Sequence, residues 1–459
     1  MDAIEGAKTV TVLRRLVAWS EKIFDLSAAV VAPVTDRRLQ PRIPTAVVVK
    51  SSIVMFWARL GSLNALGLTS RASCWKKWLP APACSADTMG RVHALMDAGE
   101  LRQGIHHIYE SLKRNKALPD TQGMGIAVVD GHESHTSYLQ HCSGCLERTM
   151  HLETGDRIQF YHRQVTLMLL WWLPSFEAFT WNSGIGGYHR SKHSPGTVVS
   201  TEYPPMLPGA PASRAPIRLL LDHEPQRPEE VEVAAAMRLL ERVIHAYPRA
   251  FDLVLADGLY LTAPFFNFLL APRKHLLVVL KDERRNLYKD AAGMFDLIAP
   301  QQGTRGSRDC LWWDFPDLLS WPQVNRAVRV VRSLETWSVR RQLDKRESIQ
   351  TSDWIWATTL SAAQTSTAWA VGFGHQRWDI ENHAFNELVS QWQADHVFKP
   401  EPNAMECFLL VAFLAYNIFH AFWALSLKPQ AKRGTTQSFW ATLICAELHG
   451  RAIPGFLSP

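Results

Sequence analysis

Two short apolar runs, each ending in an aspartate that a glycine follows, constrain the fold of this chain more than any other feature. They are Gly125–Asp130 and Phe251–Asp257. Runs of this length and composition predict strands buried on both faces of a sheet. A predicted helix with its body at Ala234–Val243 leads into the second run, and a third run follows at 275–280. This order of strands and helices predicts an α/β fold, in which helices pack on the faces of a sheet with a parallel section.

The two aspartates stand where ligands bind in such sheets, beyond the carboxyl ends of the strands. If the strands are neighbours, Asp130 and Asp257 lie a few ångströms apart and repel each other unless a cation lies between them. Hard oxygen ligands of this kind suit Mg²⁺ or Mn²⁺. Asp222 and Asp282 follow similar apolar runs, and spacing alone does not choose among the four. The alternative is that these acids cap loops at strand ends.

A third carboxylate stands in a predicted helix that begins near His375. Arg377 and Glu381 are four residues apart, which places them on one face of that helix. The pair is either an ordinary intrahelical ion pair, worth a few tenths of a kcal/mol, or part of a site. In the second case Glu381 completes the metal site and Arg377 holds a phosphate.

Several segments, in this order, resemble bacterial insertion-sequence transposases of the DDE type. The strongest are VVDGHES at 128–134, FDLVLADGLY at 251–260 and RWDIENHAFNEL at 377–388. The resemblance covers roughly residues 45–425. It implies an RNase H-like catalytic core and two-metal phosphoryl transfer at DNA ends, with Mg²⁺ or Mn²⁺ as the two ions.

Carried over residue by residue, the resemblance assigns three metal-binding catalytic acids, Asp130, Asp257 and Glu381. Arg377 matches the arginine of the Tyr-x2-Arg-x3-Glu-x6-Lys signature of related transposases, and is assigned to DNA binding. It also implies a β-rich insertion between the second aspartate and the glutamate. Related enzymes that cut and paste DNA carry their insertion at this place in the chain.

Two positions depart from that signature, whose tyrosine and lysine contact the DNA backbone near the cut. Gly374 stands where the tyrosine is expected, and Leu388 where the lysine is expected. Other basic residues would have to take over these contacts. The candidates are Lys281, Arg284 and Arg285, which follow the third predicted strand.

The chain is expected to divide into five units. These are a basic helical DNA-binding region at 1–120, the first part of an RNase H-like core at 121–280 with a loop insertion at about 182–216, a β-rich insertion at 281–370, the second part of the core at 371–427, and a C-terminal tail at 428–459.

Basic residues are concentrated in the first of these units. Residues 1–120 hold 17 Lys and Arg against 10 Asp and Glu, whereas the remainder of the chain is nearly neutral. An excess of this kind indicates a polyanionic partner, although chance clustering on a solvated face explains it equally well. With the resemblance, it predicts that the N-terminal region recognises the terminal repeats of the element, with salt-dependent affinity.

The sequence predicts a cytoplasmic protein, because no secretory signal is visible near residue 1 and the seven cysteines are sparse. The 21 uncharged residues of Cys407–Leu427 have the length of a membrane span. They include Asn417 and His420, and we interpret them as a buried helix. A membrane anchor is the alternative.

Cys142 and Cys145 form a Cys-x2-Cys half-site of the kind that binds zinc, with His151 nearby. The other cysteines are scattered, so no second cysteine pair of the usual spacing completes it. A zinc site and a short loop packed beside the active site therefore remain alternative interpretations.

The predicted function is a DNA transposase that binds terminal inverted repeats of double-stranded DNA and catalyses metal-dependent cleavage and strand transfer. The resemblance suggests a homodimer that pairs two DNA ends. Two alternatives remain: a metal-dependent nuclease that cuts without joining, and an inactive or domesticated DNA-binding protein on the same fold. The three intact acids argue against the second, whereas Gly374 and Leu388 argue mildly for it.

Overall fold

The structure is a computed structural model, and it describes residues 12–69, 84–118, 124–139, 141–153, 155–171, 181–182, 217–281, 285–340 and 347–449. The strands are β1 (Ile126–Ser137), β2 (Leu146–Leu152), β3 (Gly155–Trp171), β4 (Trp181–Asn182), β5 (Ile217–Pro225), β6 (Leu253–Ala256), β7 (His275–Val279), β8 (Gln301–Arg305), β9 (Arg308–Leu318), β10 (Val328–Arg340) and β11 (Glu347–Thr358). The helices are α1 (Val12–Phe24), η1 (Leu26–Val31), α2 (Thr45–Trp57), α3 (Leu63–Thr69), α5 (Ala86–Leu95), α6 (Ala98–Arg114), α7 (Glu232–Ala246), η3 (Gly258–Tyr260), α8 (Ala263–Leu270), α9 (Asn286–Phe295), α10 (Thr367–Gln376), η4 (Ile380–Phe385), α11 (Asn386–Ser390), α12 (Pro402–Leu425), α13 (Pro429–Lys432) and α14 (Gln437–Leu448).

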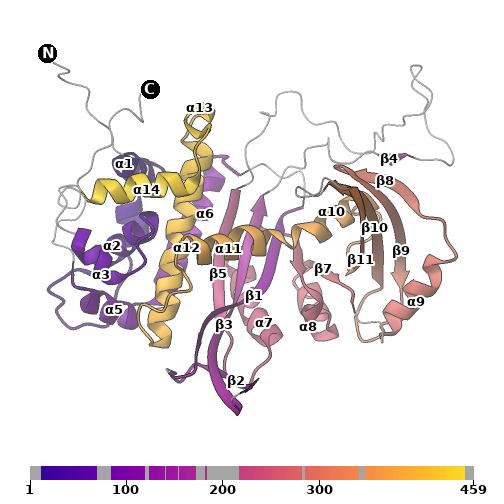
Figure 1. Cartoon of the computed structure of the whole chain (residues 1–459), viewed down its shortest axis with the longest axis horizontal. Helices are drawn as coiled ribbons and strands as arrows, with labels where there is room; N and C mark the ends of the chain where they lie inside the picture. Colours follow the sequence, from indigo (N-terminus) through magenta and orange to yellow (C-terminus); the bar gives the residue numbers. More distant parts are fainter. Residues whose placement is uncertain are drawn as a thin grey trace.

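The centre of the molecule is a mixed sheet in the order β5-β3-β1-β6-β7. Strand β3 runs antiparallel to both β5 and β1, whereas β1, β6 and β7 run parallel to one another. Helices α7 and α8 connect or follow the parallel strands, and α10, η4 and α11 cross in front of the sheet in Figure 1. This is the predicted RNase H-like α/β fold, formed because the continuous apolar runs are buried between helices on both faces.

Strand β1 is longer than the sequence indicates. The prediction that it ends at Asp130 is wrong, since pairing with β3 continues to Ser137 across a bulge between Glu133 and His135. Residues 126–130 are buried, and the residues that follow are half-buried or exposed. Asp130 therefore marks the place where β1 leaves the core.

The β-rich insertion is present as the antiparallel strands β8, β9, β10 and β11. Strand β11 pairs with β7, so the insertion extends the central sheet at its edge. In Figure 1 these strands form the end of the molecule opposite the N-terminal helices. The insertion thus removes the exposed edge that β7 would otherwise present.

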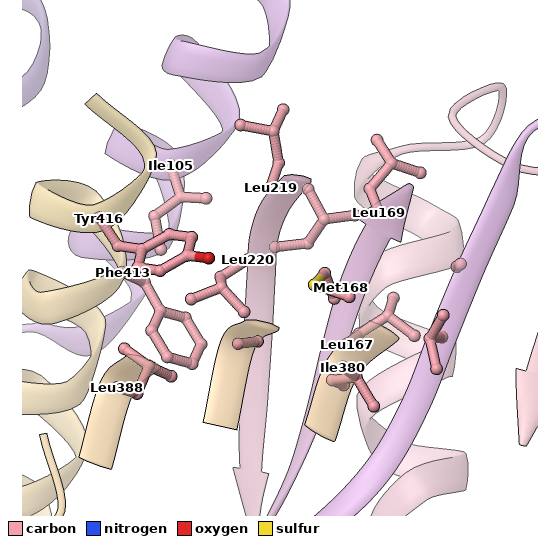
Figure 2. Close-up of a cluster of buried hydrophobic side chains, with 14 of the residues drawn as sticks. Ile105, Leu167, Met168, Leu169, Leu219, Leu220, Ile380, Leu388, Phe413 and Tyr416 are labelled. Carbon is pink, nitrogen blue, oxygen red and sulfur yellow. The ribbon is translucent and has the colours of Figure 1, made fainter. Parts of the chain in front are cut away.

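The N-terminal helices pack around α12, the long apolar helix. Helices α2, α5 and α6 all contact α12, which also packs on β5 (Figure 1). By length and composition α12 could cross a membrane, but 78% of its most apolar window is buried inside the protein, as the sequence predicts. Figure 2 shows part of this core, where Phe413 and Tyr416 of α12 approach Leu220 of β5 and Leu388 of α11.

Asn417, a polar residue in the middle of the apolar helix α12, binds the backbone of β5. Its side-chain oxygen accepts a hydrogen bond from the backbone nitrogen of Leu220 at 2.9 Å, and its nitrogen donates to the carbonyl oxygen of Leu220 at 2.8 Å. Strand β5 is an edge strand at this point, so these groups have no neighbouring strand to pair with. A buried amide satisfies both of them.

The predicted tail at 428–459 is wrong for residues 429–448, which include α13 and α14. Trp440, Ile444 and Leu448 of α14 are buried, and α14 contacts α1. The carboxylate of Glu447 accepts hydrogen bonds from the backbone nitrogens of Val12 and Leu13, at 2.6 and 3.0 Å. It therefore binds the unpaired N–H groups at the start of α1.

Candidate active site

The sheet register brings Asp130 and Asp257 to the same edge of the core. In the parallel pair of β1 and β6, Val128 pairs with Leu255; Asp130 lies two residues further along β1, and Asp257 lies two residues beyond Leu255, just after β6 ends. The two carboxyl groups are close enough that the charge of Asp257 raises the pKa of Asp130. Asp257 directly follows β6, and its Oδ1 accepts a hydrogen bond from Leu259 that closes the turn η3.

Arg377 joins Asp130 to Glu381. Its Nη1 lies 3.1 Å from Oδ2 of Asp130, and its Nη2 lies 2.8 Å from Oε1 of Glu381. Arg377 is 4% exposed, and its guanidinium also stacks on Trp378 at 4.1 Å. The predicted contact between Arg377 and Glu381 is therefore present. The Nε atom of Arg377 is buried and has no hydrogen-bond partner among the described residues, so a DNA phosphate could reach Arg377 only if the surrounding segment moved.

The segment that carries these two residues is not one regular helix. Helix α10 ends at Gln376, and the next turn, η4, is a π-helix that contains Glu381. Wider turns of this kind are frequent at functional sites, because they shift the direction of one or two side chains. Here η4 packs against β1, which brings Glu381 to the strand of Asp130.

Asp130 has an unusual protonation equilibrium. Burial raises the pKa of its carboxyl group to about 8; Arg377 lowers the pKa, and the carboxylates of Asp257 and Glu381 raise it. The single guanidinium cannot balance three carboxylates, so the cluster carries surplus negative charge. A site with this charge and these donors suits a divalent cation.

The oxygen atoms of the three acids do not all meet at one point. Among the residues that the structure describes, the only group of three ligand-type side chains within 4.8 Å of one another lies elsewhere. Ligands of a single magnesium ion must lie within about 4 Å of one another, since each bond is about 2.1 Å. The three acids are therefore not assembled around a single point in this structure.

The structure explains both departures from the transposase signature. A Cβ atom at Gly374 would lie 2.3 Å from the ring of Trp356 in β11, so a tyrosine has no space there. Leu388 is 5% exposed and belongs to the core between α11 and the sheet (Figure 2). At both positions a contact with the core replaces the side chain that would face DNA.

Two of the three basic candidates, Lys281 and Arg285, lie among the described residues. Lys281 is exposed, and its Cδ lies 3.9 Å from the Cβ position of Gly258, next to Asp257. Arg285 precedes α9, and its guanidinium lies 5.5 Å from the ring of Trp321 in the insertion. Arg284 lies outside the described residues, as does Asp282. Of these candidates, Lys281 lies beside the acids.

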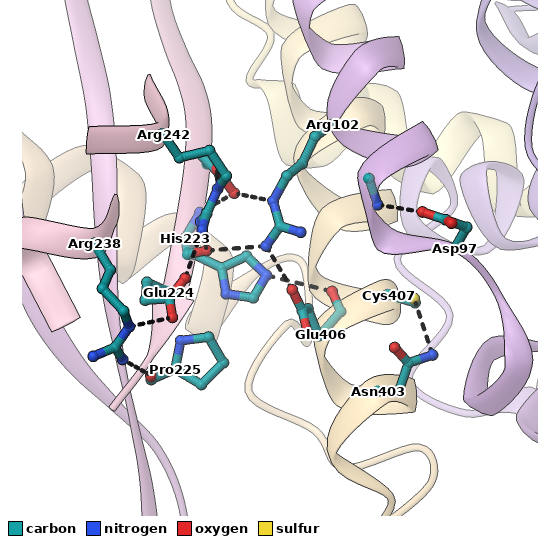
Figure 3. Close-up of polar contacts among 12 residues, drawn as sticks. Asp97, Arg102, His223, Glu224, Pro225, Arg238, Arg242, Asn403, Glu406 and Cys407 are labelled. Atoms are coloured by element: carbon teal, nitrogen blue, oxygen red, sulfur yellow. Dashed lines mark hydrogen bonds and ion pairs between the residues drawn. The ribbon is translucent and has the colours of Figure 1, made fainter. Parts of the chain in front are cut away.

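Asp222, the other candidate acid, belongs to a separate network of charges on β5. Figure 3 shows its neighbours Arg102, Arg242, Glu224 and Glu406. Asp222 accepts hydrogen bonds from Arg102 at 2.8 Å and from Arg242 at 2.6 Å. Arg102 also binds Glu406 of α12, and Arg242 also binds Glu224. Two arginines therefore neutralise Asp222, which links β5 to α6 and α7 and lies outside the cluster of acids.

Glu232 on α7 is a residue that the sequence reasoning missed. It is 8% exposed, accepts a hydrogen bond from the hydroxyl group of Tyr260 at 2.7 Å, and pairs with Arg163 at 3.4 Å. A Cβ atom at Gly131 would lie 2.3 Å from its carboxyl group. The glycine after Asp130 therefore allows α7 to approach β1 from the face opposite η4. That Asp-Gly pair was the available sequence signal.

Residues 213–418, a little under half of the chain, match the family model of the transposase DDE domain. The chain carries a transposase DDE domain. The match supports a DDE-type transposase, a class of proteins that act on DNA in transposition and recombination and generally use divalent metal ions. The match includes Asp257, Arg377 and Glu381, whereas Asp130 precedes it. A search of curated proteins finds no match to the chain.

Proposed function

We propose that this DDE transposase binds the terminal inverted repeats of its element and catalyses metal-dependent cleavage and strand transfer. One observation carries the proposal: Arg377 joins Asp130 to Glu381, while Val128 and Leu255, each two residues before an aspartate, pair between β1 and β6. These contacts support the proximity of three acids from three separate segments. Acids that only cap loops would not need to share one arginine.

In the proposed mechanism Asp130, Asp257 and Glu381 hold two Mg²⁺ or Mn²⁺ ions. Ions bound there would make the attacking water or 3′-hydroxyl more acidic and stabilise the leaving oxyanion. Arg377 orients the carboxylates of Asp130 and Glu381 through its two hydrogen bonds. Asp130 must lose its proton before it binds a cation, which gives metal binding a dependence on pH.

DNA binding is proposed for two parts of the chain. Lys281, Arg284 and Arg285 would contact the backbone near the cut, and the exposed position of Lys281 beside Asp257 supports its part. The basic N-terminal helices would recognise the terminal repeats. We further propose a homodimer that pairs two DNA ends, a cytoplasmic location, and a helix α12 that serves as a core element without a membrane role.

Cleavage of a plasmid that carries the DNA flanking the gene tests the proposal. We expect double-strand cleavage at both flanks with Mg²⁺ or Mn²⁺. Asp130→Asn, Asp257→Asn and Glu381→Gln should each lower the rate more than about 100-fold, since even outer contacts of metal ligands contribute 10–100-fold. Asp290→Asn, at an exposed position on α9, is the matched control and should cleave normally. Cleavage that survives all three substitutions would refute the assignment.

Precut ends separate the alternatives. A transposase joins them to target DNA, whereas a nuclease cuts the plasmid and does not join precut ends. Binding to the flanks without any metal-dependent cleavage would favour the inactive DNA-binding protein. In that case Gly374 and Leu388 would be the first residues to examine, because they pack in the core where two DNA-contacting residues are expected.

A further inference from the structure

A second group of potential metal ligands consists of Cys142, Cys145 and His162. None of these residues belongs to the candidate active site. The Sγ atoms of Cys142 and Cys145 are 3.9 Å apart, and each lies 3.3 Å from Nε2 of His162. In a tetrahedral zinc site with bonds of about 2.3 Å to sulfur and 2.0 Å to nitrogen, the corresponding edges are about 3.8 and 3.5 Å. The three atoms thus already occupy three corners of a site of the right size.

The loop between the cysteines has the hydrogen bonds that such a site needs. The backbone nitrogen of Cys145 donates to the carbonyl oxygen of Cys142 at 3.1 Å, which closes a tight turn. Backbone nitrogens also donate to sulfur: that of Gly144 to Cys142 at 3.4 Å, and that of Cys142 to Cys145 at 3.2 Å. N–H groups directed at sulfur are the hydrogen bonds that orient a cysteine ligand in a metal site.

Strand pairing fixes His162 between two other potential ligands. Leu146 of β2 pairs with Tyr161 of β3, so Cys145 lies opposite His162, one residue before β2 begins. On the other side of β3, His162 pairs directly with His135 of β1. Residues that pair directly across neighbouring strands point to the same face. His135, His162 and Cys145 therefore form a row across three adjacent strand positions, with Cys142 in the loop beside them.

We propose that Cys142, Cys145 and His162 bind a structural zinc ion, with His135 as the fourth ligand. Two sulfur atoms and imidazole nitrogen select zinc over magnesium, so this site is chemically distinct from the three carboxylates. The proposal does not depend on catalysis. His151, which is nearer to the cysteines in sequence, is excluded because it is exposed and pairs with Asp156 at 2.8 Å.

The position of the site indicates what the ion stabilises. Beyond Asp130, the strands β1, β2 and β3 project as a ribbon with few buried residues. The ribbon is therefore short of hydrophobic core. The loop of the two cysteines also lies near the start of α12, because the Cβ position of Gly144 is 3.6 Å from Pro402. A zinc ion would hold β1, β3 and the cysteine loop together near that helix. Strand β1 is also the strand that carries Asp130.

Metal analysis of the purified full-length protein tests the proposal. We expect about one zinc ion per chain, resistant to dialysis against a weak chelator. Replacement by Co²⁺ should give the visible absorption of a tetrahedral thiolate site, which requires no variant and so does not depend on variants that fold. Cys142→Ser and His162→Ala should each reduce the zinc content more than tenfold. The matched controls Cys445→Ser and His151→Ala should retain it.

Two results would overturn the proposal in separate parts. A metal-free wild-type protein that fails to bind Co²⁺, with Cys142 and Cys145 either as free thiols or as a disulfide, would show that no site exists. Full zinc content in His135→Ala would refute the assignment of the fourth ligand. The DNA-cleavage assay has its own outcome, since the carboxylates share no ligand with this site.

Discussion

Replacement of Asp130 by asparagine should stabilise the metal-free protein, and the gain should depend on pH. Burial raises the pKa of this carboxyl group from 3.8 to about 8 in the folded protein. The folded state therefore binds one more proton than the unfolded state between these values, and wild-type stability falls as pH rises through that range. Below pH 4 the group is protonated in both states and costs nothing.

The size of the effect follows from the same shift. About four pKa units, at about 1.4 kcal/mol each, set an upper limit of about 6 kcal/mol above pH 8. Structural relaxation and the weaker bond of asparagine to Arg377 reduce this, so we expect about 2–3 kcal/mol. At pH 4 the two proteins should be equally stable.

Urea unfolding in the presence of a chelator, at pH 4 and pH 8, measures this difference. Addition of Mn²⁺ at pH 8 should then stabilise the wild type and leave the variant unchanged, because ligands stabilise the state that binds them. Asp222→Asn is the matched control: it removes a carboxylate bonded to Arg102 and Arg242, and should destabilise by about 3 kcal/mol. A variant that is no more stable than the wild type at pH 8, or that is more stable by the same amount at pH 4, would refute the reasoning.

Three further predictions concern the fold around the site. Gly374→Ala should destabilise the protein by about 1–3 kcal/mol in thermal or urea unfolding, since its Cβ would lie 2.3 Å from Trp356. The control Gly293→Ala, in a helix with open space, should stabilise slightly, and equal changes in stability for the two variants would contradict the prediction. Asn417→Leu should lower the free energy of unfolding by about 2–4 kcal/mol, because it leaves the N–H and C=O groups of Leu220 without their partners. An unchanged unfolding midpoint would contradict the stabilising role of the contact between Asn417 and β5. Burial raises the pKa of Glu335, but hydrogen bonds from His375 and Arg305 lower it to about 2. The stabilisation by ionised Glu335 is therefore present above pH 4.5 and lost towards pH 2. The urea midpoints of wild type and Glu335→Gln should converge as the pH falls, and a constant difference between them would contradict this prediction.

The sequence was most informative where one physical effect dominates. Apolar runs such as Phe251–Asp257 can be satisfied only by burial, so the parallel strands were predictable. The proximity of Asp130 and Asp257 was expected because both acids follow buried strands, and these strands are neighbours in the sheet. Strand β1 was underestimated because residues 131–137 are polar and show no clear alternation. Its extension is stabilised by pairing with β3, which the local sequence does not reveal.

Contacts between distant segments were beyond the sequence. The carboxylate of Glu447 binds the start of α1, more than 430 positions away, so the C-terminal segment resembled a tail. His162 was missed as a partner of the two cysteines because the hairpin of β2 and β3 brings it back beside Cys145. His151 lies closer in sequence, but pairing within that hairpin directs it to Asp156. His162 could have been identified as a partner of the cysteines only from the register of the hairpin of β2 and β3.

The most direct test of the central proposal locates the metal ions on the chain itself. Fe²⁺ bound in place of Mg²⁺, with ascorbate and peroxide, generates radicals that cut the polypeptide near the ion. The proposed site predicts cuts near residues 130, 257 and 381, all suppressed by excess Mg²⁺ and absent in Asp130→Asn. Cuts confined to other segments, or no cuts that Mg²⁺ suppresses, would contradict a metal site formed by Asp130, Asp257 and Glu381.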